Sequence, residues 1–300
     1  MLGLATAVVL LAGCGAGGSG APSGPAPGTA GGAGQLPTVS KDENLAKLVP
    51  ADIAADGKIM IGTDASYPPN EYFDADGKTF IGMDVDMAKA VAAKLGLQTE
   101  FQNAAFGAIL LGISSDKYEM GISSFTINAE RTKSVDMVSY FNVGTKAAVA
   151  AGNPEKINLD DLCGKAVGVQ NDTTQVEDLD ARNKKCQAEG KPPIAVTSLQ
   201  AQTDVTLALT AKRIVAMLAD APVVTYAIGQ TGGQLEALGN QYLAAPYGIA
   251  VKKGRGEFAK AVQGAVQALI NDGTYAKIVE KYKGTEGAVA KSEINPSTGQ

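Results

Sequence analysis

The chain has 300 residues, of which 45% are hydrophobic and 19% are charged, and its formal net charge is −5. This balance is typical of a soluble globular protein with one large domain or two ordinary ones, and the acidic charge without any basic run argues against a nucleic-acid partner. The chain contains no histidine. Histidine is the commonest general base and a frequent zinc ligand, so we expect no hydrolase triad, no metal site and no cofactor.

The N-terminus predicts a lipoprotein signal over residues 1–14. Its apolar run is too short to span a bilayer and ends in "LAGC", which resembles a bacterial lipobox. Cys14 would then be the lipidated first residue of the mature chain, the alternative being an ordinary secretory signal with an incidental cysteine. Residues 15–57 are expected to form a flexible tether and lead-in, because residues 15–39 are mainly Gly, Ala, Pro and Ser without charge. We therefore expect an extracytoplasmic protein that is lipid-anchored to the membrane, at a bacterial cell surface or in a periplasm.

From Lys58 onward the sequence alternates strand and helix signals. Apolar and β-branched runs predict strands over 58–64 and 80–86, and an apolar stripe at helical spacing predicts a helix over 85–95 that ends at Gly96. The further elements expected are a helix over 106–114, strands over 118–124, 146–152 and 165–170, a helix over 173–185, a strand over 193–199, a helix over 202–213, a strand over 214–220 and a helix over 221–229. This alternation predicts an α/β architecture with mostly parallel sheets.

Two cysteines, Cys163 and Cys186, flank the strand and helix expected over 165–185. In an oxidising compartment outside the cytoplasm, an even pair of cysteines favours a disulfide over two buried free thiols. A metal site is not expected at these cysteines, because the sequence offers no further soft ligands.

Polar residues follow several expected strands, where α/β proteins bind small ligands. Asp64, Thr174 and Asp220 are three of them, although Thr174 and Asp220 could each be only a helix N-cap. The loop from Ser124 to Arg131 is another, and here an arginine enters the first turn of a helix. A cation at that position opposes the helix dipole, so Arg131 makes most sense beside a bound anion, the alternative being a solvated side chain.

Five segments in succession resemble one family. The segments are "IGTDASYPPNEY", "IGMDVDMAKAVAAKLG", "SSFTINAERTKSVDMVSYF", "VGVQNDTTQ" and "GEFAKAVQGAVQALINDGTYAKIVEKY". Together they resemble the family 3 extracellular solute-binding proteins, which serve polar amino-acid ABC importers, and the resemblance covers about residues 58–284.

The resemblance implies an α/β fold of the type II periplasmic-binding-protein kind, with two lobes and two crossing hinge segments. Its implied boundaries are 58–142 for lobe 1, completed by 252–284, then 152–243 for lobe 2, about 144–151 and 244–251 for the hinge, and 285–300 for a C-terminal tail. The implied function is to close the lobes around a polar L-amino acid and deliver it to a permease and ATPase. The protein would act as a monomer and not as an enzyme.

The resemblance also implies eight ligand-binding residues: Asp64, Tyr67, Phe106, Ser124, Thr126, Arg131, Thr174 and Asp220. Arg131 would bind the α-carboxylate with help from hydroxyl groups, and Asp220 would bind the α-ammonium. Aromatic rings would flank the ligand, although Tyr67 and Phe106 could equally be core residues. Asp64 would meet the ligand side chain and disfavour an acidic one by like-charge repulsion.

Two positions depart from the family pattern. Asn70 stands where an aromatic residue is usual, and Asp172 stands where glycine is common. Neither belongs to the implied clamp for the α-amino and α-carboxyl groups, so the class of ligand is unaffected. The ligand side chain stays open, with glutamine, asparagine, basic and acidic amino acids all possible.

Two other functions are compatible with the same fold. A dehydratase-like enzyme would need a catalytic acid over the ligand, for which Asp64 or Glu71 could serve. A ligand-binding sensor would dock on a signalling receptor instead of a permease. The expected lipid tether favours the transporter partner.

Overall fold

The computed structural model describes residues 37–298. Cys14, the expected signal and most of the expected tether lie outside these residues. Within residues 37–298, no helix is both long enough and apolar enough to cross a membrane.

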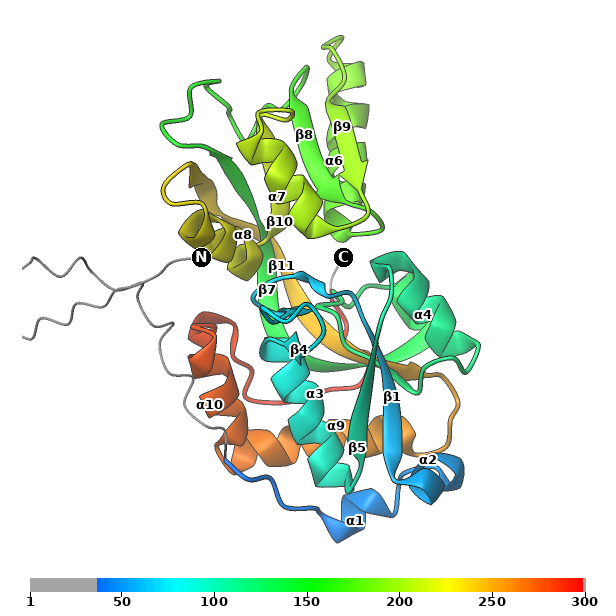
Figure 1. The fold of residues 1–300 in the computed structure, drawn as a ribbon. Helices are drawn as coiled ribbons and strands as arrows, with labels where there is room; N and C mark the ends of the chain where they lie inside the picture. The colour runs from blue at the N-terminus through cyan, green and yellow to red at the C-terminus, as the bar shows by residue number, and fades with distance from the viewer. Residues whose placement is uncertain (1–36, 299–300) are drawn as a thin grey trace, which may run out of the picture. The chain divides into compact units, whose positions relative to one another are not determined.

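One large mixed sheet of eight strands forms the frame of the structure (Figure 1). Its strands are β1 (Lys58–Thr63), β5 (Gln98–Asn103), β6 (Met120–Gly121), β7 (Val135–Ala150), β8 (Ala166–Gln170), β9 (Ala195–Leu199), β10 (Ala216–Asp220) and β11 (Leu235–Lys252). They lie in the order β5-β1-β6-β11-β7-β10-β8-β9. A small sheet consists of β2 (Ser66–Tyr67), β3 (Glu71–Phe73) and β4 (Phe80–Ile81).

Parallel pairing occurs on both flanks of the large sheet, between β1 and its neighbours and between β8 and its neighbours. The central strands β7 and β11 are instead antiparallel to each other and to β10 and β6. They are 16 and 18 residues long, and their mutual register shifts at several points between Leu238 and Gly248. The expectation of mostly parallel pairing therefore holds for the flanks and is wrong for the central pair.

The helices of the described residues cover both faces of this sheet (Figure 1). They are α1 (Glu43–Ala46), α2 (Ala51–Asp56), α3 (Met83–Leu95), α4 (Phe106–Ser114), α5 (Arg131–Ser134), α6 (Thr174–Ala188), α7 (Gln202–Thr210), α8 (Ala221–Gln230), α9 (Phe258–Asn271), α10 (Thr274–Lys281) and the 3₁₀ turn Thr285–Gly287.

The elements pack into two lobes joined by β7 and β11 (Figure 1). We call lobe 1 the part that carries β1, β5, α3, α4 and α9, and lobe 2 the part that carries β8, β9, β10, α6, α7 and α8. In lobe 1, buried side chains such as Ile61, Val91 and Val262 form one core between the sheet and two helices. In lobe 2, separate cores include Val169 and Met217. Each lobe thus buries its own apolar surface, which is the main source of its stability.

Most of the expected elements are present, and α4 has the predicted bounds. The strand expected over 80–86 is wrong after Ile81, because Gly82 takes a positive φ of 129° and α3 begins at Met83. Two acidic residues in the first turn of α3 favour this helix start. The strand expected over 118–124 is reduced to β6, and Ser124, with a φ of 52°, turns the chain out of the sheet.

Residues just outside the expected lobe 1 also belong to its packed structure. The lead-in before residue 58 contains α1 and α2, and Val49 and Ile53 are part of the lobe 1 core. Near the C-terminus, the Ser292 hydroxyl donates to the Ser139 carbonyl at 2.7 Å and the Ser139 N–H donates to the Glu293 carbonyl at 2.8 Å. These contacts fasten the described part of the tail to β7.

The expected disulfide between Cys163 and Cys186 is confirmed. It joins the loop before β8 to the last turn of α6 and closes a separation of 23 residues. In the chain-entropy description, a cross-link over such a loop stabilises a fold by about 3 kcal/mol. The bond therefore fixes the far end of α6, whose first residues reach the site described next.

Candidate functional site

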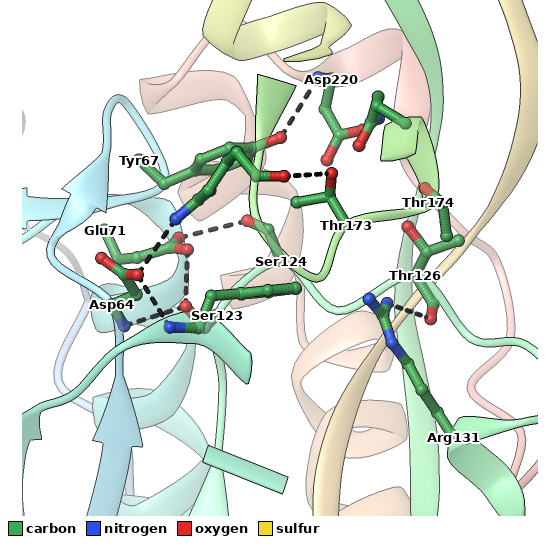
Figure 2. Close-up of a pocket in the computed structure, with 13 residues that line it drawn as sticks. Asp64, Tyr67, Glu71, Ser123, Ser124, Thr126, Arg131, Thr173, Thr174 and Asp220 are labelled. Carbon is green, nitrogen blue, oxygen red and sulfur yellow. Dashed lines mark hydrogen bonds between the residues drawn. The ribbon is translucent and has the colours of Figure 1, made fainter. Parts of the chain in front are cut away.

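A pocket lies between the two lobes, and 13 side chains that line it are drawn in Figure 2. All eight of the predicted ligand-binding residues line it, and they are joined there by Glu71, Ser123, Gln170, Thr173 and Gln175. The space between these atoms is about 280 Å³, including the opening to solvent. The structure thus brings the predicted residues together, while their contact with a ligand stays a prediction.

Arg131 provides the positive charge of the pocket. Its guanidinium lies over the ring of Phe106, with 5.2 Å between Cζ and the ring centroid. Nη1 donates to the Thr126 carbonyl at 2.8 Å and Nη2 to the Asp172 carbonyl at 3.0 Å. Burial lowers the pKa of Arg131, and none of the carboxylates among residues 37–298 forms an ion pair with it. Two of its five N–H donors are used by carbonyls, so the others are available to an anion.

The basis of this anion-binding corner differs from the expected one. α5 is a single turn of four residues, so the helix-dipole argument made from the sequence has little support. Hydroxyl groups of Thr126 and Thr174 lie on the same side of the pocket as the guanidinium (Figure 2). Thr174 is the first residue of α6 after the N-cap Thr173, and no side chain caps this helix. The corner therefore offers donors, as a carboxylate requires.

The backbone conformation of Asp172 shows why glycine is common at this position in the family. Its φ is 62°, in the left-handed region that favours glycine. The carbonyl of this residue is the one that accepts from Arg131, which makes a contact between the lobes. Its backbone conformation, rather than its side chain, therefore serves the site.

Asp220 provides a buried carboxylate at the start of α8. It occupies the N-cap position, but its side chain makes no cap hydrogen bond. Instead Oδ1 accepts from the Gln175 amide at 2.8 Å and Oδ2 from the Tyr247 hydroxyl at 2.6 Å. Burial raises the pKa of Asp220, and these hydrogen bonds oppose the rise. The carboxylate has only neutral partners, so a ligand ammonium can provide the missing positive charge.

Tyr67 and Phe106 both pack in a core and line the pocket. Tyr67 is part of a lobe 2 core, and its hydroxyl oxygen accepts from the Asp220 backbone N–H at 3.2 Å. Phe106 stacks on Phe125 with 4.8 Å between ring centroids. The two alternatives weighed from the sequence, core packing and a place in the ligand cleft, are thus both true of these rings.

Asp64 lies at the opposite side of the pocket from Arg131 (Figure 2). Its Oδ2 accepts from the Phe106 N–H at 2.9 Å and from the Gln170 amide at 3.0 Å, and Oδ1 accepts from the Ser66 N–H at 3.2 Å. Burial raises its pKa, and the surrounding donors counteract that rise. Every partner is a donor, so these hydrogen bonds favour the charged carboxylate and oppose the effect of burial.

Glu71 and Asp84 form a buried carboxyl pair, of which Glu71 lines the pocket. The Ser124 hydroxyl lies 3.2 Å from Glu71 Oε2 and 3.3 Å from Asp84 Oδ2, and it also accepts from the Asn70 amide at 2.9 Å. One hydroxyl proton can serve only one carboxylate, so a proton on the pair accounts for the second contact. Asn70, the other departure from the family pattern, supports this pair and does not line the pocket.

The electrostatics of the pair agree with a shared proton. Both side chains are 0% exposed. Burial raises the pKa of Asp84 to about 6, and burial together with the Asp84 charge raises the pKa of Glu71 well above its ordinary value. Two carboxylates in one dry site cannot both ionise easily. Glu71, whose pKa is raised the more strongly of the two, is therefore the member of the pair that holds the proton, and it lines the pocket as a neutral acid.

Glu71→Gln is expected to change how stability depends on pH. Carboxyl groups whose pKa is raised by folding stabilise the fold fully at pH values below their unfolded pKa, and this stabilisation is lost as pH rises through the folded pKa. The wild type should therefore lose stability from about pH 4 through pH 6 and above, while the variant keeps a neutral partner for Asp84. Relative to the wild type, the variant should gain about 3–6 °C in Tm between pH 5 and pH 8, at about 2–4 °C per kcal/mol.

Thermal unfolding without ligand, followed by circular dichroism, checks this expectation. Glu119→Gln is a suitable control, because Glu119 is another lobe 1 carboxylate whose Oε2 accepts from a backbone N–H, that of Met60. A Tm difference between the Glu71 variant and the wild type that stays constant from pH 5 to pH 8 would show that the pair holds no proton.

Comparisons with known proteins identify relatives among the solute-binding proteins. Residues 59–285 match the model of the bacterial extracellular solute-binding proteins, family 3. The arginine-binding protein ArgT of Corynebacterium glutamicum is 32% identical over 249 residues, which cover 83% of this chain and 81% of that protein.

Solved structures share the fold as well as sequence. An ancestral arginine-binding protein bound to arginine has a TM-score of 0.71 at 33% identity, covering 75% of this chain and 98% of that one. The ancestral amino acid-binding protein AncCDT-1, a precursor of cyclohexadienyl dehydratase, has a TM-score of 0.67 at 28% identity, covering 77% and 97%. These matches confirm the two-lobe α/β fold expected from the sequence.

Proposed function

Because the chain belongs to the family 3 bacterial extracellular solute-binding proteins, we propose that it captures a cationic L-amino acid, of the arginine type, for an ABC importer. It is the extracytoplasmic amino-acid-binding component of that importer, and it delivers the ligand to a membrane permease driven by an ATPase. The relatives named above support this ligand class, since two of them are arginine-binding proteins.

The observation that carries the ligand class is the charge of the pocket. Asp64, Glu71, Arg131 and Asp220 are the charged types that line it. With Glu71 protonated, two carboxylates face one guanidinium, so the site has one negative charge in excess. Buried charges are costly without partners, and a ligand with a net positive charge is the one that neutralises the site.

The positions of the charged side chains also indicate how the ligand would be oriented in the pocket. The α-carboxylate binds Arg131, the α-ammonium binds Asp220, and the cationic side chain extends toward Asp64. A neutral amino acid leaves Asp64 without a cation, and an acidic one brings a second negative charge beside it.

Closure of the two lobes supports tight binding in this proposal. β7 and β11 cross between the lobes, and their register shifts lie within 238–248, close to the hinge expected over 244–251. We propose that bending there opens and closes the pocket. The contacts that a ligand makes with both lobes favour the closed form only if they are made together.

A thermal-shift screen tests the proposed function. L-Arginine and L-lysine should stabilise the protein by about 4 kcal/mol at a thousandfold excess over Kd. L-Glutamine should stabilise it less, and L-glutamate, succinate and sugars should have almost no effect. Equal stabilisation by succinate or a sugar would exclude an amino-acid site, whereas a preference for glutamine would exclude only the cationic class.

Binding rather than catalysis is favoured for this chain. The carboxyl groups that an enzyme could use are Asp64 and Glu71, and each is already held by donors from the protein. AncCDT-1 itself is named an amino acid-binding protein, although it is a precursor of a dehydratase. We therefore propose a monomeric binding protein that is not an enzyme. If it also served a signalling receptor, the ligand would be the same.

A lipid anchor at Cys14 completes the proposal, on the basis of the lipobox-like sequence alone. Cys14→Ser should move the protein from the membrane fraction to the soluble fraction and leave ligand affinity unchanged. Detergent partition followed by titration with L-arginine measures both properties. Retention of the serine variant in membranes would disprove lipidation at this residue.

A further inference from the structure

We propose that Gln170 determines which side chains the pocket accepts, by offering its carbonyl oxygen to N–H groups of the ligand; this rests on the proposed function. Gln170 is the last residue of β8, is 2% exposed, and lines the pocket from lobe 2. Its Nε2 donates to Asp64 Oδ2 at 3.0 Å and to the Gln200 carbonyl at 3.1 Å. Its Oε1 is buried and has no hydrogen-bond partner among residues 37–298.

The orientation of this amide is determined by its neighbours. Both groups around Nε2 are acceptors, namely a carboxylate and a backbone carbonyl. Rotating the amide by half a turn would put its oxygen against two other oxygens, which is repulsive. Oε1 must therefore face away from them and remain an acceptor without a donor. Because a buried acceptor without a donor is unfavourable, the position favours a ligand that provides one.

Gln170 and Asp64 together form an acceptor site shared by the lobes. Asp64 follows β1 in lobe 1, and Gln170 ends β8 in lobe 2, so both acceptors are near one ligand only when the lobes are closed. A guanidinium carries several N–H donors in one plane and no acceptor, which suits two acceptors side by side. The urea group of L-citrulline has the same shape but is neutral, and it has an oxygen acceptor in place of one amino group with its two N–H donors.

A different explanation is that Gln170 acts only as a clasp between the lobes through its Nε2 donor. The two roles depend on different atoms of the same amide. Gln170→Glu keeps acceptor oxygens and removes the donor, whereas Gln170→Met removes both at nearly the same size. The clasp therefore predicts that both variants weaken binding alike, and the acceptor role predicts that they differ.

Isothermal titration of the full chain with L-arginine and with L-citrulline separates these roles. Gln170→Met should bind arginine at least about tenfold more weakly, as expected for a lost hydrogen bond to a charged group. Gln170→Glu should bind arginine within about threefold of the wild type or more tightly, with an increased preference for arginine over citrulline.

Gln175→Met is the matched control. Gln175 is another buried glutamine of the pocket, but its amide holds Asp220 and Thr145 rather than Asp64. Loss of the Gln175 amide should weaken the binding of arginine and of citrulline by similar factors, because both ligands carry the same α-ammonium group. Melting curves of all three variants establish that each is folded.

Several outcomes would overturn the proposal. Equal loss of arginine affinity in the glutamate and methionine variants would make Gln170 a clasp, and unchanged affinity in both would exclude it from the site. If the wild type binds L-glutamine but neither L-arginine nor L-lysine, the cationic ligand class is wrong and the role of Gln170 is wrong with it. If the wild type binds L-arginine and Gln170→Met binds it with the same affinity, the role proposed for Gln170 is wrong and the proposed ligand class is unaffected.

Discussion

Arg131→Ala is expected to weaken the binding of L-arginine by two orders of magnitude or more. The guanidinium is the positive charge of the pocket, and the ligand α-carboxylate would lose its partner in a closed, dry site. Removing one partner of such a pair costs about 3–5 kcal/mol, which corresponds to roughly two to three and a half orders of magnitude in Kd. Isothermal titration measures the loss directly.

A variant on the same short helix and a ligand analogue make this test specific. Lys133→Ala removes an exposed cation from α5 that forms an ion pair with Glu130, and it should leave affinity unchanged. Agmatine, which is arginine without its carboxylate, should bind the wild type weakly and the Arg131 variant equally weakly. Wild-type affinity of Arg131→Ala for L-arginine would remove this residue from the site.

Asp220→Asn is expected to weaken the binding of every α-amino acid ligand by about two orders of magnitude, whichever side chain the ligand carries. Asparagine retains the shape and one acceptor oxygen, but it loses the charge that pairs with the ligand ammonium, at a cost of about 3 kcal/mol or more. Because burial disfavours the Asp220 carboxylate when no ligand is present, the ligand-free variant should be no less stable than the wild type. Titration and melting of the same sample measure both effects.

A thermodynamic cycle tests the pairing of Asp220 with the ammonium. 5-Guanidinopentanoic acid is arginine without its α-amino group, and the wild type should bind it far more weakly than arginine. The Asp220 variant should discriminate little between the two ligands, since the interaction that distinguishes them is already absent. Undiminished discrimination in the variant would mean that another residue binds the ammonium.

Local sequence signals predicted the elements that depend on neighbouring residues. The helix at 106–114 had a continuous apolar pattern and appears with those bounds. The strand expected over 80–86 failed after Ile81, because Met83 to Asp86 alternate apolar and acidic residues as a strand does, while Gly82 starts a helix there. The long strands β7 and β11 were underestimated, since their extent depends on pairing between residues about a hundred positions apart.

The candidate site was predictable where charge and hydroxyl groups mark it. Asp64, Arg131 and Asp220 are charged residue types that line the pocket, and the family resemblance implied roles for them before the fold was known. Gln170 was missed, because a neutral amide has no sequence signal and its partner Asp64 is 106 residues away. The protonated state of Glu71 was also missed, since it arises from burial beside Asp84 and not from the sequence around it.

The first and the last of the described residues both belong to lobe 1. α1 packs against α3 near the first described residues, and Glu293 joins β7 near the last ones. Lobe 2 is therefore an insertion, attached to the rest through β7 and β11. If the proposed lipid anchor at Cys14 is present, it is joined in sequence to lobe 1, and lobe 2 can move on its two connecting strands while the attached lobe stays in place.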